Sequence, residues 1–393
     1  MSFGATAALV LGMARSGEAA AAALEARGTR VVRVDRKLGN DDDLSLLDGV
    51  ELLVKSPGVR GEHPLVAAAR QRGIPVWSEV ELGYRLHPER PLVGVTGTNG
   101  KTTTVELLGA IFRAAGIDVA VAGNVGRPLT GVEEADWVVC ELSSFQLEDV
   151  HELACRVAVL LNLEPDHLDR HGSFEAYRDA KLRIFERAGA AVVPRGFEIA
   201  GIEFSPDDPL PAEPLLPGAH NRANAAAATA AARAAGIGDG AIAEALRTFP
   251  GVEHRLELVA ERGGVRYVND SKATNTGAAR TGLHAFDAPL HLILGGSLKG
   301  ESFDELARDV AARGRVRPLL IGEATGELAD ALDRAGVEYE RAETLERALR
   351  IAAGRAVPGE IVLLSPACAS FDQFENFERR GEEFRRLVQN LEG

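Results

Sequence analysis

The residues best suited to chemistry lie in one stretch, residues 91–104, which reads PLVGVTGTNGKTTT. Its apolar beginning predicts a short buried strand, and the apolar spacing after the turn predicts a helix. A glycine-rich turn in this position can point backbone N–H groups at phosphate, while a lysine reaches the outer phosphates and a threonine hydroxyl holds Mg²⁺. The residues expected to contact phosphate are Gly97, Thr98, Asn99, Gly100, Lys101, Thr102 and Thr103.

This loop departs from the strict phosphate-loop pattern at one position. Val95 stands where the strict pattern has glycine, so the match is to a variant loop. The alternative interpretation is an ordinary glycine turn before a helix. The lysine and threonine directly after the turn favour the phosphate interpretation.

Two further groups of ligand-forming side chains follow predicted strands. Glu141 ends the apolar run 137–140, where an acid beside a phosphate loop could hold Mg²⁺. A strand-end carboxylate that simply faces water is the alternative. Residues 162–169, NLEPDHLD, follow the strand predicted at 157–161. Taken alone, that second stretch fits a hydrolase metal site or a helix cap.

The beginning of the chain predicts another turn between a strand and a helix, at residues 12–17. It lacks the middle glycine of GxGxxG, so a nicotinamide or flavin dinucleotide site is not expected. A nucleotide-like ligand remains open, with phosphates near Arg15 and Ser16 and a sugar or base near Asp35 and Arg36. A purely structural Rossmann-like unit is equally consistent with this pattern.

Composition limits the functions that this chain can serve. Its 393 residues suggest two or three domains, and a net charge of −14 argues against a nucleic-acid or anionic membrane surface. Three cysteines without CxxC spacing suggest a reducing compartment and no zinc site. No apolar run approaches ~20 residues, and no basic-then-apolar leader opens the chain. We therefore expect a soluble cytoplasmic protein, and a monomer.

Strands alternate with helices along the chain, which predicts an α/β fold with parallel sheets covered on both faces. Prolines at 88 and 91 and a short linker near 250 divide it into three predicted domains, 1–90, 91–251 and 252–393. The expected architecture is a Rossmann-like domain, a central phosphate-loop domain and a Rossmann-like C-terminal domain. Strands are expected at 5–10, 30–34, 50–54, 92–95, 119–121, 137–140, 157–161, 290–294, 316–321 and 361–364, with a hairpin at 256–260 and 264–268.

Several motifs together resemble a known family. They are GTNGKTTT at 97–104, GNVG at 123–126, ELSSFQ at 141–146, NLEPDHLDRHG at 162–172, HNRAN at 220–224 and EHRLE at 253–257. The chain is similar to the Mur ligases, the ATP-dependent enzymes of peptidoglycan synthesis. Folylpolyglutamate synthetases share several of these motifs. NDSKATN at 269–275 and LLSPACASFDQFENFERRG at 363–381 resemble the family members that add D-glutamate.

The resemblance implies a reaction and its participants. ATP would activate the alanine carboxylate of UDP-MurNAc-L-Ala as an acyl phosphate, which the amine of D-glutamate would then attack. Joining an anionic carboxylate to a triphosphate needs positive charge, for which the family uses a lysine and two Mg²⁺ ions. The catalytic residues implied here are Lys101, His167 and Lys181.

The resemblance also assigns binding residues. The metal ligands would be Thr102 and Glu141 for one Mg²⁺ ion, and His167 and Lys181 for the other. Further ATP contacts would be Asn221, Asn224, Arg255, Asp270, which would take the ribose, and Lys272. The UDP-sugar would contact Arg15, Ser16, Asp35, Arg36, Gly58 and Asn124. D-Glutamate would contact Thr274, Lys299, Ser370 and the backbone near Phe377.

Lys181 carries a specific chemical expectation. It lies in a helix predicted at 173–187, where Tyr177 and Phe185 share its face at i−4 and i+4. A lysine on a solvated helix face is the ordinary alternative. A protonated amine near Mg²⁺ would be repelled, whereas a carbamate formed with CO₂ is an anionic oxygen ligand. The resemblance of AYRDAKLRIF to the family's carbamylated segment supports this hypothesis.

Some alternatives stay open. Thr274 could cap the next helix, Arg255 could form a surface salt bridge, and Lys272 could be only solvated. Two features depart from the family: residues 186–217 are short, and Ser297 stands where these ligases often carry an acid. A non-catalytic nucleotide-binding scaffold and a folate-type glutamate ligase are the competing functions.

Overall fold

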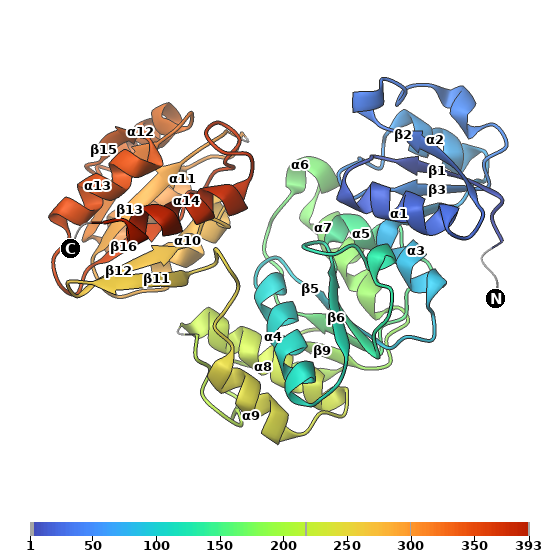
Figure 1. Ribbon diagram of the computed structural model, residues 1–393, viewed down its shortest axis with the longest axis horizontal. Helices are drawn as coiled ribbons and strands as arrows, with labels where there is room; N and C mark the ends of the chain where they lie inside the picture. The colour runs from blue at the N-terminus through green and yellow to red at the C-terminus, as the bar shows by residue number, and fades with distance from the viewer. Residues whose placement is uncertain (1–3, 217, 299, 392–393) are drawn as a thin grey trace. The chain divides into compact units, whose positions relative to one another are not determined.

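The computed structural model describes residues 4–216, 218–298 and 300–391 (Figure 1). The chain divides into two compact units, Met1–Pro250 and Gly251–Gly393. The first unit contains two parallel sheets and the second contains one mixed sheet. The α/β fold expected from the alternating sequence pattern is confirmed.

The N-terminal sheet has four parallel strands in the order β2-β1-β3-β4. Its strands are β1 (Ala7–Leu11), β2 (Arg30–Val34), β3 (Leu52–Lys55) and β4 (Val76–Ser78). The accompanying helices are α1 (Arg15–Glu25), α2 (Pro64–Gln71) and α3 (Glu79–Leu86), with 3₁₀ turns η1 (Arg36–Leu38) and η2 (Leu44–Leu47). Apolar clusters cover both faces of the sheet, which explains why β1 and β3 are buried throughout.

The central sheet has six parallel strands in the order β10-β9-β8-β5-β7-β6. Its strands are β5 (Leu92–Thr96), β6 (Val119–Gly123), β7 (Trp137–Glu141), β8 (Val157–Leu160), β9 (Ala191–Pro194) and β10 (Ile202–Phe204). Its helices are α4 (Lys101–Ala114), α5 (Ser144–Leu147), α6 (Leu168–His171), α7 (Phe174–Leu182), α8 (Ala219–Ala234) and α9 (Asp239–Thr248), with η3 (Leu129–Gly131) and η4 (Arg183–Phe185).

The C-terminal sheet has the order β11-β12-β16-β13-β14-β15, in which the predicted β11–β12 hairpin is the antiparallel pair. Its strands are β11 (Glu257–Arg262), β12 (Val265–Asn269), β13 (Leu290–Gly295), β14 (Val316–Ile321), β15 (Glu340–Glu343) and β16 (Ile361–Leu364). Its helices are α10 (Thr276–His284), α11 (Asp304–Arg313), α12 (Thr325–Arg334), α13 (Leu345–Arg355) and α14 (Phe377–Gln389). Two apolar clusters pack against this sheet.

Each sheet of the first unit has a point where the strand order reverses. In the N-terminal sheet β1 lies between β2 and β3, and in the central sheet β5 lies between β7 and β8. Ligands of open parallel sheets bind beyond the carboxyl ends of the strands at such points. The turn at 12–17 and the glycine loop at 97–100 follow β1 and β5, so both occupy ligand-binding positions.

Buried polar contacts join the N-terminal and central sheets into one unit. The Lys55 ammonium lies 2.8 Å from the Asp149 carboxylate, and the Lys55 side chain is fully buried. The Glu81 carboxylate accepts hydrogen bonds from the backbone of residues 151–153, and Glu79 accepts from the Thr130 backbone and hydroxyl. The sequence predicts two domains here, 1–90 and 91–251. Because of these contacts, the structure forms one compact unit over residues Met1–Pro250.

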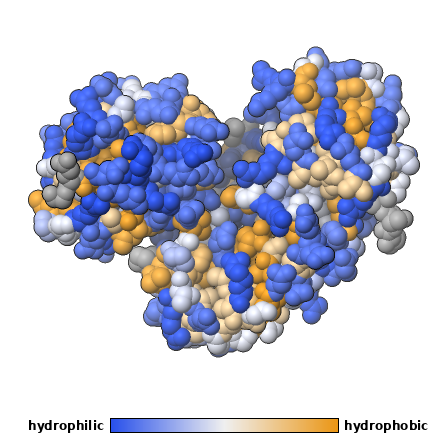
Figure 2. Space-filling model, viewed as in Figure 1, coloured by the Kyte–Doolittle hydropathy of each residue, from blue (hydrophilic) through white to orange (hydrophobic). Residues whose placement is uncertain are grey.

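Hydrophilic residues occupy much of the molecular face shown in Figure 2, as the charged content of the sequence leads one to expect. Across the described ranges, no helix combines the length and apolar character needed to cross a membrane.

Candidate active site

The glycine loop after β5 has the backbone geometry that a phosphate cradle requires. Gly97 has φ 152° and Gly100 has φ 84°, and both values lie in the region that favours glycine. The Lys101 ammonium donates to the carbonyl oxygens of Gly97 (2.9 Å) and Thr98 (2.8 Å). The charge expected to reach the outer phosphates therefore lies against the loop that would hold them.

Thr102 and Glu141 come together beside this loop. The Thr102 hydroxyl donates to Glu141 Oε2 (2.8 Å), and the Asn124 amide donates to Glu141 Oε1 (3.0 Å). Glu141 is only 3% exposed, so it does not face open water. The strand-end position predicted for this acid thus places its carboxylate next to the first turn of α4.

Lys181 is buried, which removes the solvated-face interpretation. Its side chain lies on α7, and its Nζ donates to the Gly97 carbonyl (2.8 Å) and lies 4.7 Å from the centre of the Tyr177 ring. Burial, aided by the Lys101 charge, lowers the pKa of Lys181 to about 6, while Asp166 and Glu141 act in the opposite direction. At neutral pH this amine is mostly uncharged and can act as a nucleophile.

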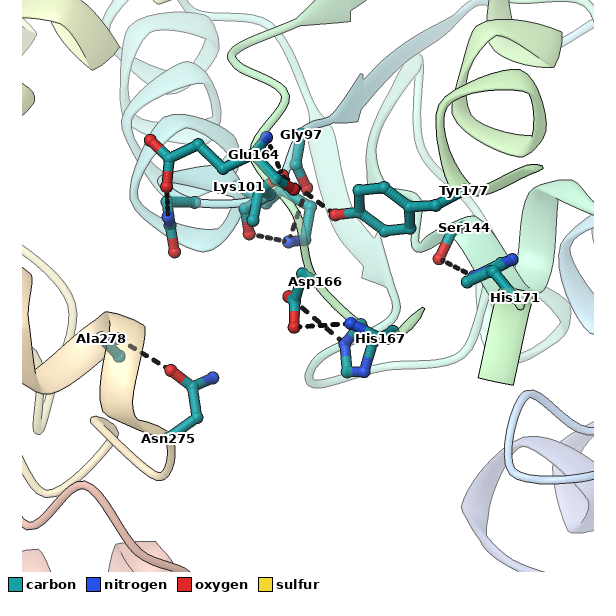
Figure 3. A network of polar contacts seen from close by, with 12 residues as sticks. Gly97, Lys101, Ser144, Glu164, Asp166, His167, His171, Tyr177, Asn275 and Ala278 are labelled. Atoms are coloured by element: carbon teal, nitrogen blue, oxygen red, sulfur yellow. Dashed lines mark hydrogen bonds and ion pairs between the residues drawn. The ribbon is translucent and has the colours of Figure 1, made fainter. Parts of the chain in front are cut away.

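His167 lies at the start of α6, near the same loop (Figure 3). It adopts φ 53°, an uncommon left-handed conformation for a residue with a side chain, and its ring is exposed. Its Nε2 lies 3.5 Å from Asp166 Oδ2, and its ring packs edge-on against Phe145 at 4.9 Å. Local backbone strain at an exposed imidazole is typical of a functional position.

A layer of side chains that the sequence motifs did not single out as ligands fixes this loop in place. The Thr98 hydroxyl contacts the Tyr177 hydroxyl (2.9 Å) and the Glu164 carbonyl (3.1 Å) (Figure 3). The Asn99 backbone N–H donates to the Asn162 side chain (2.9 Å). In the sequence, only their position in the polar loop after the predicted strand 157–161 pointed to a role for Asn162 and Glu164.

Helix α8 carries the two candidate asparagines, and one of them, Asn224, lies against the glycine loop. Asn221 and Asn224 are 9% and 7% exposed. A methyl group at Gly100 would lie 2.3 Å from the Asn224 side-chain oxygen, so Gly100 has no room for a larger residue. One turn of α8 therefore lies directly beside the end of the phosphate loop.

The six predicted UDP-sugar residues all line one cavity of about 720 Å³ at the carboxyl ends of β1 and β3. They are Arg15, Ser16, Asp35, Arg36, Gly58 and Asn124. Asp35 is already engaged by the backbone N–H groups of Lys37 (2.8 Å) and Met13 (2.6 Å), which lower its pKa. Asn124 belongs to the central sheet, so this cavity reaches the Glu141 site.

In the C-terminal unit, Asp270 is buried and has three neighbouring partners. Its carboxylate accepts from the Ser365 hydroxyl (2.8 Å) and the Leu256 N–H (3.3 Å), and it lies 3.6 Å from the Arg255 guanidinium. Burial raises the pKa of Asp270 to about 6, an effect that Arg255 opposes. Arg255 therefore has an internal partner. Asp270, which was expected to contact the ribose, is fully buried here.

The residues expected to bind D-glutamate lie in loops that other contacts hold together. Asn275, not Thr274, caps α10, because its side chain accepts from the Ala278 N–H (2.7 Å). Ser370 is buried, and the Phe377 carbonyl accepts from the Ser271 hydroxyl (2.8 Å). The Lys272 ammonium lies 5.7 Å from the Phe377 ring centre. Lys299 lies outside the described residues.

Two other side chains organise these loops. The Ser297 hydroxyl accepts from the Asp372 N–H (2.7 Å), so it joins its loop to the one that follows Ser370. Arg380 is 1% exposed and donates to the Ser271, Cys368 and Ala369 carbonyls. Arg380 could not be distinguished in the sequence from the arginines beside it that lie on the surface.

The donor groups fit a nucleotide-bound Mg²⁺ ion better than a preformed metal cluster. Among the described ranges, no three His, Cys, Asp or Glu side chains form a ready cation site. Thr102 and Glu141 could offer two oxygen ligands, and Mg²⁺ commonly takes its remaining ligands from water and substrate phosphates. His167 and Lys181 would complete a second site only if Lys181 gained oxygen donors.

Comparison with known proteins defines the class. Residues 95–199 match the Mur ligase middle domain, and residues 254–368 match the Mur ligase, glutamate ligase domain. The chain belongs to the Mur ligase family. It is 41% identical to UDP-N-acetylmuramoylalanine--D-glutamate ligase of Acidobacterium capsulatum, over 97% of this chain and 95% of that protein. Its identity to the protein of that name from Desulfitobacterium hafniense is 39%, over 97% and 96%.

Solved structures support the fold. UDP-N-acetylmuramate-alanine ligase from Thermotoga maritima has a TM-score of 0.62 at 19% identity, covering 98% of this chain and 99% of that one. The folylpolyglutamate synthase/dihydrofolate synthase of Yersinia pestis has a TM-score of 0.59 at 19% identity, covering 79% and 92%. The match to the Acidobacterium protein extends over 443 residues, more than the 393 of this chain, so that relative carries additional residues between matched segments.

Proposed function

We propose that this chain adds D-glutamate to UDP-MurNAc-L-Ala in the cytoplasm, with conversion of ATP to ADP and phosphate. This is the reaction for which its 41% identical relative is named. The observation that carries the proposal is the position of Asn124. It lines the cavity beyond β1 and β3, and it also donates to Glu141 beside the phosphate loop. A sugar nucleotide in that cavity would extend its acyl end toward ATP.

The first chemical step joins two anions. A carboxylate oxygen of the alanyl group attacks the γ-phosphorus, the bond to the β-γ bridging oxygen breaks, and ADP leaves. The Gly97–Gly100 backbone and Lys101 bind the phosphates, so their N–H groups and positive charge oppose the repulsion between carboxylate and triphosphate. Asn221 and Asn224 would contact the nucleotide from α8.

Mg²⁺ would be held by Thr102 and Glu141 on the ATP side and by His167 and Lys181 on the acyl side. When bound, these ions neutralise charge on the phosphates and on the acyl oxygens. Lys181 can serve there only as a carbamate. Its depressed pKa favours the neutral amine, which adds CO₂ to form the N–C bond and releases one proton. The product is an anion with two oxygen donors, consistent with a ligand for a hard cation.

The second step forms the amide. The neutral amine of D-glutamate attacks the acyl carbon, phosphate leaves, and the nitrogen loses a proton. We assign D-glutamate binding to Thr274, Ser370, the Phe377 backbone and Lys299 of the C-terminal unit, and further nucleotide contacts to Arg255, Asp270 and Lys272. Asp270 would have to give up part of its present hydrogen bonding to reach a ribose.

Phosphate release tests the proposal. We expect release only when ATP, UDP-MurNAc-L-Ala and D-glutamate are all present. A Lys101→Ala control should abolish it. Release that ignores both acceptor substrates would indicate an ATPase, and no release at all would favour a non-catalytic nucleotide-binding protein.

A folate-type glutamate ligase is the nearest alternative, because the folylpolyglutamate synthase fold is similar. The same assay separates the two functions when it is supplied with tetrahydrofolate and L-glutamate. The N-terminal cavity favours the sugar nucleotide, since it presents Arg15 and Ser16 at the start of α1, where phosphates bind well.

A further inference from the structure

One chain of contacts connects the sugar-nucleotide cavity to His167 and does not involve any residue that would bind ATP. It begins at Val59, which lines the cavity, and it passes through Arg170 and the ring of Phe145. We propose that Arg170 is a positioning residue that transmits occupancy of this cavity to the imidazole of His167. The inference rests on the proposed function, because it takes this cavity as the sugar-nucleotide site.

The first contact crosses from the N-terminal sheet to the central one. An Arg170 guanidinium nitrogen donates to the Val59 carbonyl oxygen at 2.7 Å. Val59 belongs to the loop after β3, together with Gly58, which was assigned to the sugar nucleotide. A ligand that shifts this loop therefore changes the position of the group to which Arg170 is bonded.

The second contact is a stack on Phe145. The Arg170 guanidinium carbon lies 3.7 Å from the centre of the Phe145 ring, a close cation–π contact. The ring of His171 stacks on Phe145 at 5.1 Å and 9°. Phe145 thus has a defined orientation, and its ring meets the His167 ring edge-on at 4.9 Å. The Phe145 ring and Asp166, which lies 3.5 Å from His167 Nε2, are thus the two contacts that constrain this exposed imidazole among those described for it.

A second path closes these contacts into a ring. His171 Nδ1 lies 3.2 Å from Glu148, and Glu148 lies 3.3 Å from the buried ammonium of Lys55. Lys55 ends β3, four residues before Val59. The cavity loop is therefore attached at both of its ends to side chains that contact Phe145, through Lys55 and Glu148 to His171 and through Val59 to Arg170.

Arginine suits this role better than lysine. A planar guanidinium can stack on a ring and donate in its own plane at the same time, whereas an ammonium is a point charge. Arg170→Lys should keep the charge and lose the stack. Replacement of outer groups that orient a metal-binding histidine typically costs about 10–100-fold in activity or metal affinity.

The test uses UDP as the probe and the His167 ring signal as the readout. In histidine-labelled protein, with the signal assigned through His167→Gln, UDP should shift the His167 resonance of the unmodified chain. In Arg170→Gln, UDP should bind within about threefold of the original affinity, but the shift of this resonance should be clearly smaller, because only the path through Lys55 and Glu148 remains. The turnover number of that variant should fall about 10–100-fold, with an unchanged Michaelis constant for ATP.

Arg85→Gln is the matched control. Arg85 joins α3 to the central sheet, through Glu152 at 3.4 Å, and it also stacks on an aromatic ring, that of Trp77 at 4.1 Å, but neither contact involves the cavity loop or Phe145. This variant should retain the UDP-induced shift. Phe145→Leu should lose it, which keeps the test decisive if Arg170→Gln does not fold. Losses in turnover from Arg170→Gln and Phe145→Leu should not add in the double variant, because both break one path.

The inference would be overturned by a full shift in Arg170→Gln, by an equal loss of shift in Arg85→Gln, or by additive losses in the double variant. Failure of the proposed function would look different. If UDP shifts His167 through Arg170 but no D-glutamate-dependent phosphate release occurs, the coupling stands and the proposed reaction is wrong. If UDP does not bind, the cavity assignment and the coupling are both wrong.

Discussion

The surroundings of Lys181 determine both the protonation state and the reactivity of its amine. Its ammonium form would be buried beside Lys101 and next to the Gly97 carbonyl. A buried cation is costly without a carboxylate partner, and the neutral amine is the better-tolerated form. The same environment that penalises the charge prepares the nitrogen for reaction with CO₂.

We predict that Lys181→Ala loses most ligase activity while still folding and binding ATP, because the variant lacks the proposed acyl-side metal ligand. A small added carboxylate should partly restore turnover by supplying the missing oxygens. Lys181→Arg keeps positive charge but cannot form this carbamate. Full activity in Lys181→Arg, measured by phosphate release, would contradict the carbamate assignment.

A second prediction concerns stability. The pKa of Lys181 falls from 10.5 to about 6 on folding, so between these values the unfolded chain binds a proton that the folded chain lacks. This opposes folding most strongly below pH 6, and the penalty shrinks as pH rises toward 10.5. Lys181→Met should therefore raise the free energy of unfolding at pH 6 and give little gain near pH 10.

Denaturant unfolding in CO₂-free buffer measures this difference. A gain that stays constant between pH 6 and pH 10 would mean that the lysine titrates normally in the folded protein.

The sequence allowed some of these side chains to be placed and not others. Thr102, Glu141 and Asn124 follow strands or open a helix, and parallel strands bring such positions to one sheet edge, where the structure places them together. Arg170 and Phe145 gave no such signal. Their roles depend on a stack between two short helices, and an arginine or phenylalanine on a helix is ordinary in any protein.

At the scale of elements, the unit that matters most is β5, its glycine loop and α4. Gly100 ends the loop with φ 84° and lies against Asn224 of α8, while Gly116 follows the other end of α4 with φ 74° and open space around it. These two glycines have the same backbone requirement but different surroundings. Substitutions at Gly100 and Gly116 therefore distinguish the effect of backbone strain on ATP binding from the effect of a crowded nucleotide site.

We predict that Gly100→Ala weakens ATP binding by about tenfold or more, because the added methyl group would displace Asn224 or the loop. Gly116→Ala should cost roughly 1–2 kcal/mol of stability through its left-handed backbone and leave ATP affinity unchanged. Calorimetric titration with an ATP analogue measures the affinity of the two variants, and denaturant unfolding measures their stability. Equal affinity losses in the two variants would mean that strain alone is responsible.

Elements with strong apolar patterns were predicted well. The strands predicted at 30–34, 316–321 and 361–364 are confirmed with the expected bounds. The helix predicted at 173–187 ends as α7 at Leu182 and continues as a 3₁₀ turn to Phe185. The short strands β4, β9, β10 and β15 were missed. β10 and β15 are largely solvent-exposed and lack an apolar run, and β4 and β9 are only three and four residues long.

At the scale of the whole molecule, three sheets form two compact units with a boundary at Pro250 and Gly251. The three sheets could be predicted from the alternating strands and helices. The union of the first two could not, because it depends on buried polar pairs such as Lys55 with Asp149, which are far apart in the sequence.

The linker between the units carries unusual backbone conformations. Gly251 has φ 99°, and the non-glycine residues His254 and Leu256 have φ 61° and 46°. We predict that the C-terminal unit closes over the nucleotide, which would protect the acyl phosphate from water. Small-angle scattering should show a smaller radius of gyration with UDP-MurNAc-L-Ala and an ATP analogue than without them. An unchanged radius at saturation would argue against closure.

The central claim is that the alanyl carboxylate attacks the γ-phosphate of ATP before the amide forms. Oxygen labelling tests it most directly. UDP-MurNAc-L-Ala labelled with ¹⁸O in its carboxylate is converted with D-glutamate and ATP, and the products are weighed by mass spectrometry. We expect one labelled oxygen in the released inorganic phosphate, because that oxygen bridges carbon and phosphorus in the intermediate. Label in AMP, or phosphate without label, would contradict the account.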